Sequence, residues 1–434
     1  MLTEIKDVFE KMNKDRYVIG YDLTNQYVQM SFCRIDSDNP ETFSVAEEEE
    51  QYNIPMVLCH KRSTGQWLIG EEALKCADEG DGMAVTDFLA TAKSGGTVFI
   101  DREEYHARDL LALFLKRSLN MLPVMATPEK IANITIALRG ADVEMIKMLQ
   151  SAVSILKVDA DRISFTGYEE CVFFYMLYQN AELKNHQILV FDAGDENLWS
   201  YRLERNHFTN PSIAMVEAVE YPDFKVRDQR YLSKTEKDSK LLQIATQICE
   251  NRVFSGVFLI GEGFYDDWCN NSLRFLCRNR RVFKGNNLFS KGACLAAKEK
   301  ANPSGYEKSI RYFGIDRLKC NIGIQAFEGG KEINIPMINA GEHWYEAEAK
   351  TEILLHESDS IPITVEYINS RQVAVADFVL KGLPVSPNRM TRIELDVKMT
   401  SETRVVLHAV DLGFGEIYPS SQKEWKEEMD LQYQ

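Results

Sequence analysis

The segment YVIGYDLTNQYVQMSF, residues 17–32, carries the pattern from which the fold can be interpreted. Two β-prone runs flank a polar turn, and an acidic residue, Asp22, stands at the end of the first run. A strand, an acid, a turn and a second strand together form a common cradle for a nucleotide phosphate. Such a turn usually contains glycines, because they let the backbone approach the phosphate, but this turn reads Thr24-Asn25-Gln26. The segment therefore predicts a phosphate site or the remains of one.

A second copy of this pattern lies further along the chain. The segment HQILVFDAG, residues 186–194, reads as a strand that ends in Asp192 and Gly194, and LWSYRLE follows as its hairpin partner. Helical and strand patterns alternate around both hairpins, which is typical of an α/β fold. We therefore expect an internal duplication over residues 17–300, with two similar lobes that face one cleft.

The rest of the chain divides into shorter segments. Residues 1–16 have apolar positions at helical spacing and predict an amphipathic helix that packs on this protein's own body or on a partner. Residues 301–318 contain Pro303 and Gly305 and predict a linker. Eight short β-prone runs within residues 319–421, the sixth of them VAVADFVL, predict a β-sandwich. Residues 422–434 predict a charged tail, either one helical turn or disordered.

Charge and cysteine content narrow the classes of function and location. The 434 residues carry a net charge of −16, which repels nucleic acid and anionic membranes. The stretch RFLCRNRRVFK, residues 274–284, is locally basic and is interpreted as a solvated helix end or loop. The nine cysteines form no CxxC pair, and the seven histidines show no metal-ligand spacing, so we expect no metal site. Small buried thiols favour a reducing, cytoplasmic location.

The order of several short motifs resembles the 70-kDa heat-shock protein (Hsp70) family of the actin-like ATPase superfamily. The stretches GYDLTNQ (20–26) and LVFDAGDENLW (189–199) resemble its two phosphate loops, and FLIGEG (258–263) resembles its adenosine loop. SKGACLAA (290–297) resembles the helix that follows, and residues 378–416 resemble the end of its peptide-binding sandwich. The chain is also similar to an uncharacterised bacterial family of shortened Hsp70-like proteins in which the DLGFGE stretch recurs. The resemblance implies a two-lobed nucleotide-binding-type domain followed by an all-β sandwich.

The resemblance also implies where nucleotide and Mg²⁺ would lie. In that family, carboxylates surround Mg²⁺ and its waters while glycine-rich loops hold the phosphates. The residues of this sequence at or beside those positions are Asp22, Thr24, Asn25, Lys75, Asp192, Gly194, Asp195, Gly261 and Gly263. We treat them as remnant nucleotide or Mg²⁺ candidates and assign no catalytic residue and no metal ligand, and we leave ATP with Mg²⁺ open as the one candidate cofactor.

Several positions depart from the family pattern. Thr24 replaces a glycine of the first loop, and Asp195 and Glu196 replace two glycines of the second. An acid about 4 Å from a phosphate oxygen costs roughly 4 kcal/mol at an effective dielectric constant of 20. Trp199 stands in place of the second carboxylate, and Leu74 stands in place of the catalytic lysine, with Lys75 one residue late.

Three further departures concern the crossing helix, an extra lobe and a lid. Phe165-Thr166-Gly167 occupies the place of Asn-Glu-Pro, so Glu169 or Glu170 would substitute only with a shift of register. Only 51 residues separate Arg205 from Ser255, inclusive, too few for the lobe that clamps adenine in Hsp70. The chain as given also ends soon after the sandwich, so no helical lid over a peptide groove is expected.

Two structural questions remain open at this point. Asp22 and Asp192 are either remnants of an Mg²⁺ site or caps of their turns. Trp199 either fills the cleft with apolar surface or stacks on adenine.

Three functions remain open as well. We expect a divergent Hsp70-like protein that does not hydrolyse ATP and that binds a protein or extended peptide through its sandwich. The alternatives are an ATP-dependent Hsp70-type chaperone with atypical loops and an actin-like protein that polymerises. A retained affinity for nucleotide would favour the chaperone.

Overall fold

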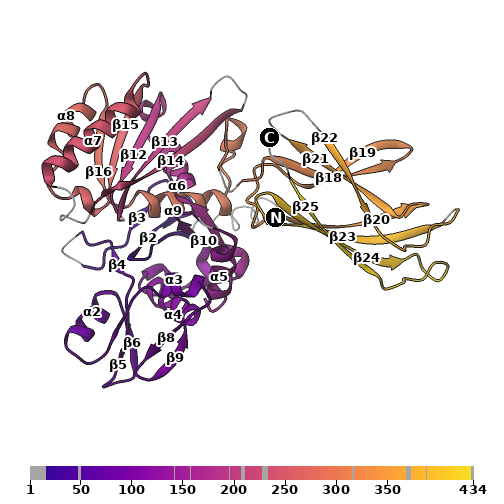
Figure 1. The fold of residues 1–434 in the computed structure, drawn as a ribbon, viewed down its shortest axis with the longest axis horizontal. Coiled ribbons are helices and arrows are strands. Elements are labelled where there is room, and N and C mark those ends of the chain that lie inside the picture. Colours follow the sequence, from indigo (N-terminus) through magenta and orange to yellow (C-terminus); the bar gives the residue numbers. More distant parts are fainter. Residues whose placement is uncertain are drawn as a thin grey trace, which may run out of the picture. The chain divides into compact units, whose positions relative to one another are not determined.

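The structure, a computed structural model, divides the chain into two compact units, residues 1–312 and 313–434 (Figure 1). It describes residues 16–431 except 47–49, 141, 157, 195, 207–210, 227–232, 315–316, 368–372 and 388. The amphipathic helix expected over residues 1–16 lies outside the described residues, apart from Arg16. No helix in the described ranges combines the length and apolar character that a membrane crossing needs.

The first sheet of unit 1 is built around the opening hairpin. Its strands run in the order β11-β10-β1-β2-β3, with β4 also paired to β2. β1 pairs with β2 in antiparallel fashion and with β10 in parallel, and β10 pairs with β11 in parallel. The strands are β1 (Tyr17–Leu23), β2 (Tyr27–Arg34), β3 (Glu41–Thr42), β4 (Ile54–Pro55), β10 (Ile131–Leu138) and β11 (Ile163–Gly167). Every residue of β10, IANITIAL, is buried, as is typical of a central parallel strand.

The second sheet of unit 1 repeats this arrangement. Its order is β16-β15-β12-β13-β14-β17, in which β12 pairs with β13 in antiparallel fashion and with β15 in parallel, and β15 pairs with β16 in parallel. The strands are β12 (Gln187–Asp192), β13 (Asn197–Asn206), β14 (Ser212–Lys225), β15 (Phe254–Ile260), β16 (Arg281–Gly285) and β17 (Ile310–Tyr312). The two sheets therefore share strand order and direction, with β1 equivalent to β12 and β10 to β15.

Helices and smaller sheets complete unit 1. The α-helices are α2 (Gly70–Asp78), α3 (Phe88–Lys93), α4 (Ala107–Leu119), α5 (Val143–Val153), α6 (Tyr168–Leu177), α7 (Lys234–Cys249), α8 (Asn270–Leu276) and α9 (Leu288–Ala301). The remaining strands are β5 (Leu58–Lys61), β6 (Gln66–Ile69), β7 (Ala84–Val85), β8 (Thr97–Ile100) and β9 (Glu103–His106). Local sequence sets several helix starts: Ser233 and Glu236 form a capping box on α7, and Asp142 caps α5.

Helix α9 holds the centre of unit 1 together because two glycines let the backbone pack closely. A Cβ atom on Gly20 of β1 would lie 2.1 Å from the carbonyl oxygen of Ser290 in α9. A Cβ atom on Gly292 of α9 would lie 2.2 Å from the carbonyl oxygen of Cys171 in α6. Glycine is therefore required at both contacts, which bring α9 against the first sheet and against α6.

Unit 2 consists of two four-stranded antiparallel sheets, with orders β19-β18-β21-β22 and β20-β23-β24-β25. Buried and less buried residues alternate along β23 and β24, which is typical of strands with one face in a core. The strands are β18 (Cys320–Glu328), β19 (Lys331–Ile338), β20 (Glu348–His356), β21 (Ser360–Tyr367), β22 (Val373–Val379), β23 (Met390–Ser401), β24 (Arg404–Gly413) and β25 (Glu424–Asp430).

Three expectations from the sequence need correction here. The expected linker 301–318 contains β17, which pairs in parallel with residues 212–214 of β14. The charged tail 422–434 contains β25, which pairs with β24, so opposed charges such as Arg404 and Asp430 lie side by side. WYEAEA, residues 344–349, is one of the eight β-prone runs expected after residue 319, but it is mostly a turn, and its last residues join β20. In each case long-range strand pairing decided the outcome, and local composition does not reveal that pairing.

Candidate functional site

The two acids singled out from the sequence occupy equivalent places in the two sheets. Asp22 lies near the end of β1, opposite Ala137 of β10, and Asp192 ends β12, opposite Ile260 of β15. Both side chains are buried, and the charge of Asp192 is close enough to influence the pKa of Asp22. The fold therefore brings the two acids into one region, as the duplication predicted.

An arginine that the sequence analysis did not single out lies at this point. Arg139 follows the last residue of β10, and its guanidinium forms an ion pair with Asp192. The guanidinium carbon lies 5.1 Å from the ring centre of Tyr168 and 4.8 Å from that of Trp199. A buried carboxylate needs a compensating cation, and here the chain supplies that cation itself.

Tyr168 is the hydrogen-bond partner of the other acid, Asp22. It begins α6, its hydroxyl donates a hydrogen bond to Asp22 Oδ1, and its ring stacks on Phe289 of α9 at 3.8 Å between centres. Burial raises the pKa of Asp22 from 3.8 to about 7; the Tyr168 hydrogen bond and the Arg139 charge oppose this rise, and the Asp192 charge adds to it. Asp22 is therefore held as a partly protonated acid near neutral pH.

The first turn closes on itself through Thr24. The Thr24 hydroxyl accepts hydrogen bonds from the main-chain N–H groups of Gln26 at 3.1 Å and Tyr27 at 2.9 Å, and donates one to the Tyr27 carbonyl at 2.7 Å. In a phosphate loop such N–H groups point at the phosphate, whereas here they bond to a side chain. Asn25, at the tip, is exposed.

The remaining glycines serve the packing of two loops against each other. Gly261 has φ +91°, and a Cβ atom there would lie 2.3 Å from the main-chain nitrogen of Gly194. A Cβ atom on Gly263 would lie 2.7 Å from the carbonyl oxygen of Ala193. The N–H of Gly194 in turn donates to Asp192 Oδ1 at 2.8 Å. The glycines allow loop-to-loop contact, and Asp192 both caps its own turn and pairs with Arg139.

Two other candidates lie outside this arrangement. Lys75 is exposed in the last turn of α2 and lines none of the three cavities considered below. Asp195 falls outside the described residues. Glu170, in the first turn of α6, is buried and accepts a hydrogen bond from the Thr166 hydroxyl at 2.9 Å.

Two cavities adjoin these residues. The first, about 170 Å³, is lined by Thr24, Asn25, Tyr168, Arg139 and Gly194 among others. Sites for drug-sized ligands usually span roughly 300–1,000 Å³, so this cavity is too small for a nucleotide.

The second cavity measures about 460 Å³ and is lined by three acids, Glu50, Glu71 and Glu262. It lies between β4 and the loop after β15, where Asn53 hydrogen-bonds to Glu262. Three carboxylates on its wall disfavour a triphosphate.

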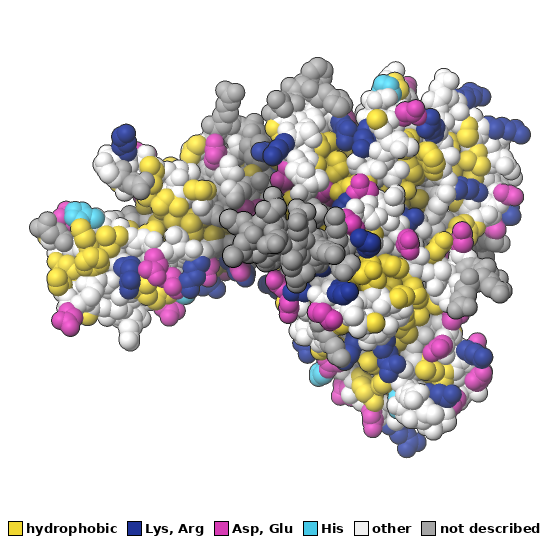
Figure 2. Space-filling view, turned by 180° about the vertical axis from the view of Figure 1, so that it is seen from behind, with side chains coloured by type: hydrophobic (Ala, Val, Ile, Leu, Met, Phe, Trp, Pro, Cys, Tyr) yellow, Lys and Arg dark blue, Asp and Glu magenta, His cyan; other side chains and the backbone are white. Residues whose placement is uncertain are grey.

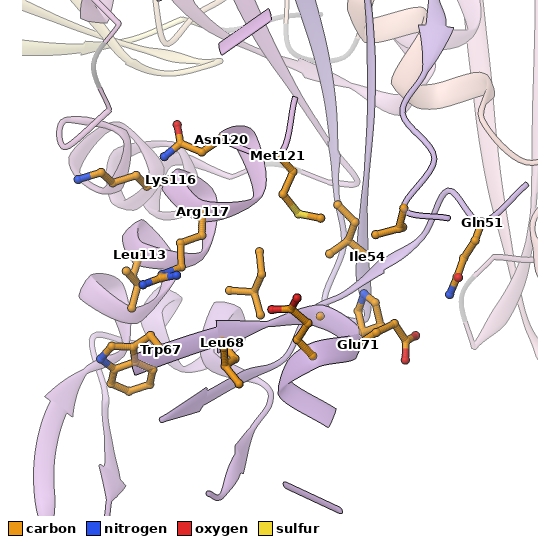
Figure 3. A pocket seen from close by; sticks show the side chains of 15 residues that line it. Gln51, Ile54, Trp67, Leu68, Glu71, Leu113, Lys116, Arg117, Asn120 and Met121 are labelled. Carbon is orange, nitrogen blue, oxygen red and sulfur yellow. The ribbon is translucent and has the colours of Figure 1, made fainter. Parts of the chain in front are cut away.

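A third cavity, about 730 Å³, lies between α4 and the β6–α2 segment (Figure 3). Leu113 and Met121 face Ile54 and Leu68 across it, while Lys116 and Arg117 stand on one wall. These two cations lie in the last turn of α4 and Glu71 in the first turn of α2, which are the ends where helix dipoles favour those charges. The dipoles of α4 and α2 therefore explain why these charged side chains stand at the groove.

The arrangement does not fit the Mg²⁺–nucleotide complex that the resemblance implies. Mg²⁺ needs carboxylate oxygens directed at the ion or its waters, but Asp192 faces Arg139 and Asp22 faces Tyr168. The described residues also contain no group of three or more His, Cys, Asp or Glu side chains placed to hold a metal. Chemically, these side chains form a closed network of charges and hydrogen bonds between the two sheets.

One feature of the sequence could have identified Arg139 as a residue of this site. Arg139 directly follows a wholly buried strand that pairs in parallel with β1, and such strand ends meet at one edge of a sheet. A cation at that edge, beside two acids, is a candidate partner for either of them. Tyr168 had no comparable signal, because 146 residues separate it from Asp22.

Comparisons with known proteins agree with the division into two units. Residues 39–314 match the model described as "Family of unknown function (DUF5716) C-terminal", and residues 317–431 match "Domain of unknown function (DUF8552)". The gap between the matches falls just after the boundary between the units, at residues 312 and 313. No curated protein matches the chain. Because the first match covers more than half of its residues, the chain belongs to the DUF5716 C-terminal family.

Proposed function

We propose that this chain is a divergent Hsp70-like protein whose former nucleotide site is closed by its own side chains, and which acts by binding other proteins. The observation that carries the proposal is the ion pair between Arg139 and Asp192, with Tyr168 bonded to Asp22 beside it. In this proposal the two sheets with equal strand order correspond to the two lobes of an actin- or Hsp70-type domain, and unit 2 corresponds to a peptide-binding sandwich.

The loss of hydrolysis follows from what surrounds the two acids. A guanidinium already neutralises Asp192, so a metal ion would have to displace a cation that is only 20% exposed and lies over the Trp199 ring. The N–H groups of the first turn are bonded to Thr24, and the cavity beside them measures only about 170 Å³. The position of Arg139 over the rings of Tyr168 and Trp199 also supports the interpretation that Trp199 fills the cleft with apolar surface.

Protein binding is best supported at strand β22 of unit 2. β22 is an edge strand with the sequence VAVADFV, and its first five residues are exposed on both faces. Val373 is 57% exposed and Val375 is 54% exposed. The other edges carry the usual protection against pairing, a proline in β19 and dense charge in β20 and β25. An exposed edge that carries only one charge, Asp377, is suited to the addition of an extended peptide strand.

Thermal unfolding with nucleotide tests the closed site. The intact chain is heated with Mg²⁺ alone, with Mg²⁺–ATP and with Mg²⁺–ADP. A ligand at 100 times its dissociation constant would stabilise the protein by about 2.7 kcal/mol, roughly a 5 °C rise in the midpoint. We expect no shift at millimolar ATP, and a clear shift would replace this proposal with the ATP-dependent chaperone. Arg139→Met serves as the matched variant, because it removes the cation that Mg²⁺ would have to displace at Asp192.

Peptide binding is tested separately. A fluorescein-labelled peptide of eight alternating Val and Thr residues is titrated against the chain and followed by anisotropy. Val373→Lys together with Val375→Lys should weaken binding, whereas Leu354→Lys, at a half-exposed position in β20, should not. Equal binding by all three proteins would remove β22 from the proposal.

We further infer a cytoplasmic location from the cysteines. All nine are free thiols and eight are buried. Cys59 and Cys76 lie 3.4 Å apart and Cys33 and Cys294 lie 3.6 Å apart between sulfur atoms, so both pairs depend on a reducing environment to stay unlinked. Fractionation of cells that make the chain, followed by alkylation of free thiols, would test this inference.

A further inference from the structure

A basic surface on the second sheet of unit 1 stands apart from the rest of this acidic chain. Residues 268–298 contain no Asp or Glu, although the whole chain carries 66 acids and a net charge of −16. The same residues contain seven cations: Arg274, Arg278, Arg280, Arg281, Lys284, Lys291 and Lys298. Figure 2 shows Lys and Arg side chains over the part of unit 1 that carries α7, α8 and β16.

Most of the exposed cations of this surface have no acidic partner in the described part of the chain. Arg281 forms an ion pair with Glu182. Arg274, Arg278 and Lys284 are exposed and form no ion pair with any described residue. Arg280 lies over the ring of Phe275, with 5.2 Å between the guanidinium carbon and the ring centre. The solvated helix end expected from the sequence is thus also a concentrated patch of uncompensated positive charge.

The same surface contains an open strand edge. β16 is the terminal strand of its sheet, paired in parallel with β15 from Arg281 to Gly285, and no described strand lies on its other side. Successive side chains of a strand point to opposite faces. Val282 packs against the core cluster that includes Leu276 of α8, so Lys284 shares the face of β16 that is directed at this cluster. Phe283 points to the other face, where it stacks on Phe258 at 4.8 Å and remains 37% exposed.

We propose that the open edge of β16 binds an extended acidic peptide segment of a partner protein, in which acidic and apolar residues alternate. The backbone of the segment pairs with β16, its carboxylates face Lys284, Arg274 of α8 and Arg278 just beyond α8, and its apolar side chains lie against Phe283. The same cations keep this edge from pairing with strands of like charge, so the edge discriminates in favour of acidic segments. The proposal concerns β16 and involves neither Arg139 nor β22, so it does not depend on the function proposed above.

The first part of the test separates strand pairing from plain charge attraction. A fluorescein-labelled octapeptide of alternating Glu and Val is titrated against the full chain at low salt and followed by anisotropy. An octapeptide of alternating Glu and Pro has the same charge but cannot pair as a strand, because proline lacks the N–H group. We expect the Glu–Val peptide to bind at least about tenfold more tightly and its affinity to fall as salt is added. Equal binding of the two peptides would overturn strand pairing, and no binding of the Glu–Val peptide would overturn the proposal.

The second part locates the surface. The triple variant Arg274→Glu, Arg278→Glu, Lys284→Glu should weaken Glu–Val binding at least about tenfold. The matched control Lys116→Glu, Arg117→Glu, Lys147→Glu changes the net charge equally elsewhere on unit 1 and should bind as the parent does. Thermal midpoints verify that both variants fold, and equal loss in both would overturn the assignment. An eight-residue oligothymidine, added as a competitor, should not displace the peptide; tighter binding of the oligonucleotide would assign the surface to nucleic acid instead.

Discussion

The guanidinium of Arg139 is paired with the carboxylate of Asp192 between two sheets of equal strand order. It lies over the rings of Tyr168 and Trp199, and the second acid, Asp22, is hydrogen-bonded to Tyr168. The network is complete without any added ion, because each buried acid has its partner within the chain. This relationship determines what changes in the centre of unit 1 should do.

Removal of Arg139 should destabilise the protein strongly. Arg139→Ala leaves Asp192 as a buried carboxylate without its cation, which typically costs about 3–5 kcal/mol in the free energy of unfolding. Urea unfolding measures this change. Arg392→Ala is the control, because Arg392 pairs with Glu352 at 3.6 Å where both side chains are 54% exposed, and such pairs contribute under about 1 kcal/mol. Similar costs for the two variants would contradict the role given to Arg139.

The raised pKa of Asp22 predicts a specific pH dependence. With a pKa of about 7 in the folded chain and 3.8 when unfolded, the folded state binds more protons between these values, so stability falls as pH rises through that window. Asp22→Asn removes this titration while its amide oxygen can still accept the hydrogen bond from Tyr168. Relative to the parent, the variant should gain up to about 4 kcal/mol between pH 4 and pH 8. Asp109→Asn, at an exposed position, should show no such trend; a difference independent of pH at Asp22 would contradict the prediction.

Close packing of α9 on α6 should make Gly292 sensitive to a single methyl group. Gly292→Ala places a Cβ atom 2.2 Å from the carbonyl oxygen of Cys171, and the two helices would have to separate. Such overpacking typically costs about 1–3 kcal/mol, measurable by chemical unfolding. Gly285→Ala has open space around its Cβ and should change stability by under about 0.5 kcal/mol. Tolerance at Gly292 would show that this helix contact is looser than described.

The DLGFGE stretch of unit 2 should depend on its aspartate. Buried Asp411 accepts hydrogen bonds from the N–H groups of Gly413 at 2.8 Å and Ser421 at 2.7 Å, and from the Ser421 hydroxyl at 2.6 Å. Burial opposes ionisation of Asp411, but the bonds from Ser421 and Gly413 and the charge of Arg389 lower its pKa overall. This stabilising contribution is therefore present at neutral pH and is lost as pH falls through the lowered pKa.

Asp411→Ala should accordingly speed amide hydrogen exchange in residues 413–421 and cost about 2–4 kcal/mol, because the buried N–H of Gly413 and the partly buried N–H of Ser421 lose a charged acceptor. Asp396→Ala, on the neighbouring strand β23, has no such bonds to this loop and should leave exchange there unchanged. Unchanged exchange in the Asp411 variant would mean that the loop is held by other contacts.

Much of the local structure could be predicted from the sequence. The run IANITIAL is a buried strand, the two acids stand at strand ends, and the alternating β-prone runs after residue 319 form two antiparallel sheets. These features depend on the period of hydrophobic residues and on turn residues, which act over a few positions. The strands β17 and β25 could not be predicted in this way, because they form only where a distant partner offers an edge.

The sequence by itself determined that an acid stands at the end of the first strand in each of two similar hairpins. It also determined that glycines expected around a phosphate are replaced by other residues. Only the tertiary structure decided what occupies that place, since Arg139 lies 53 residues before Asp192 and Tyr168 lies 146 residues after Asp22. The physical reason is the cost of burying a charge. A buried carboxylate must be matched by whichever donor or cation the packed chain brings near it, and packing of elements far apart in the sequence determines which one that is.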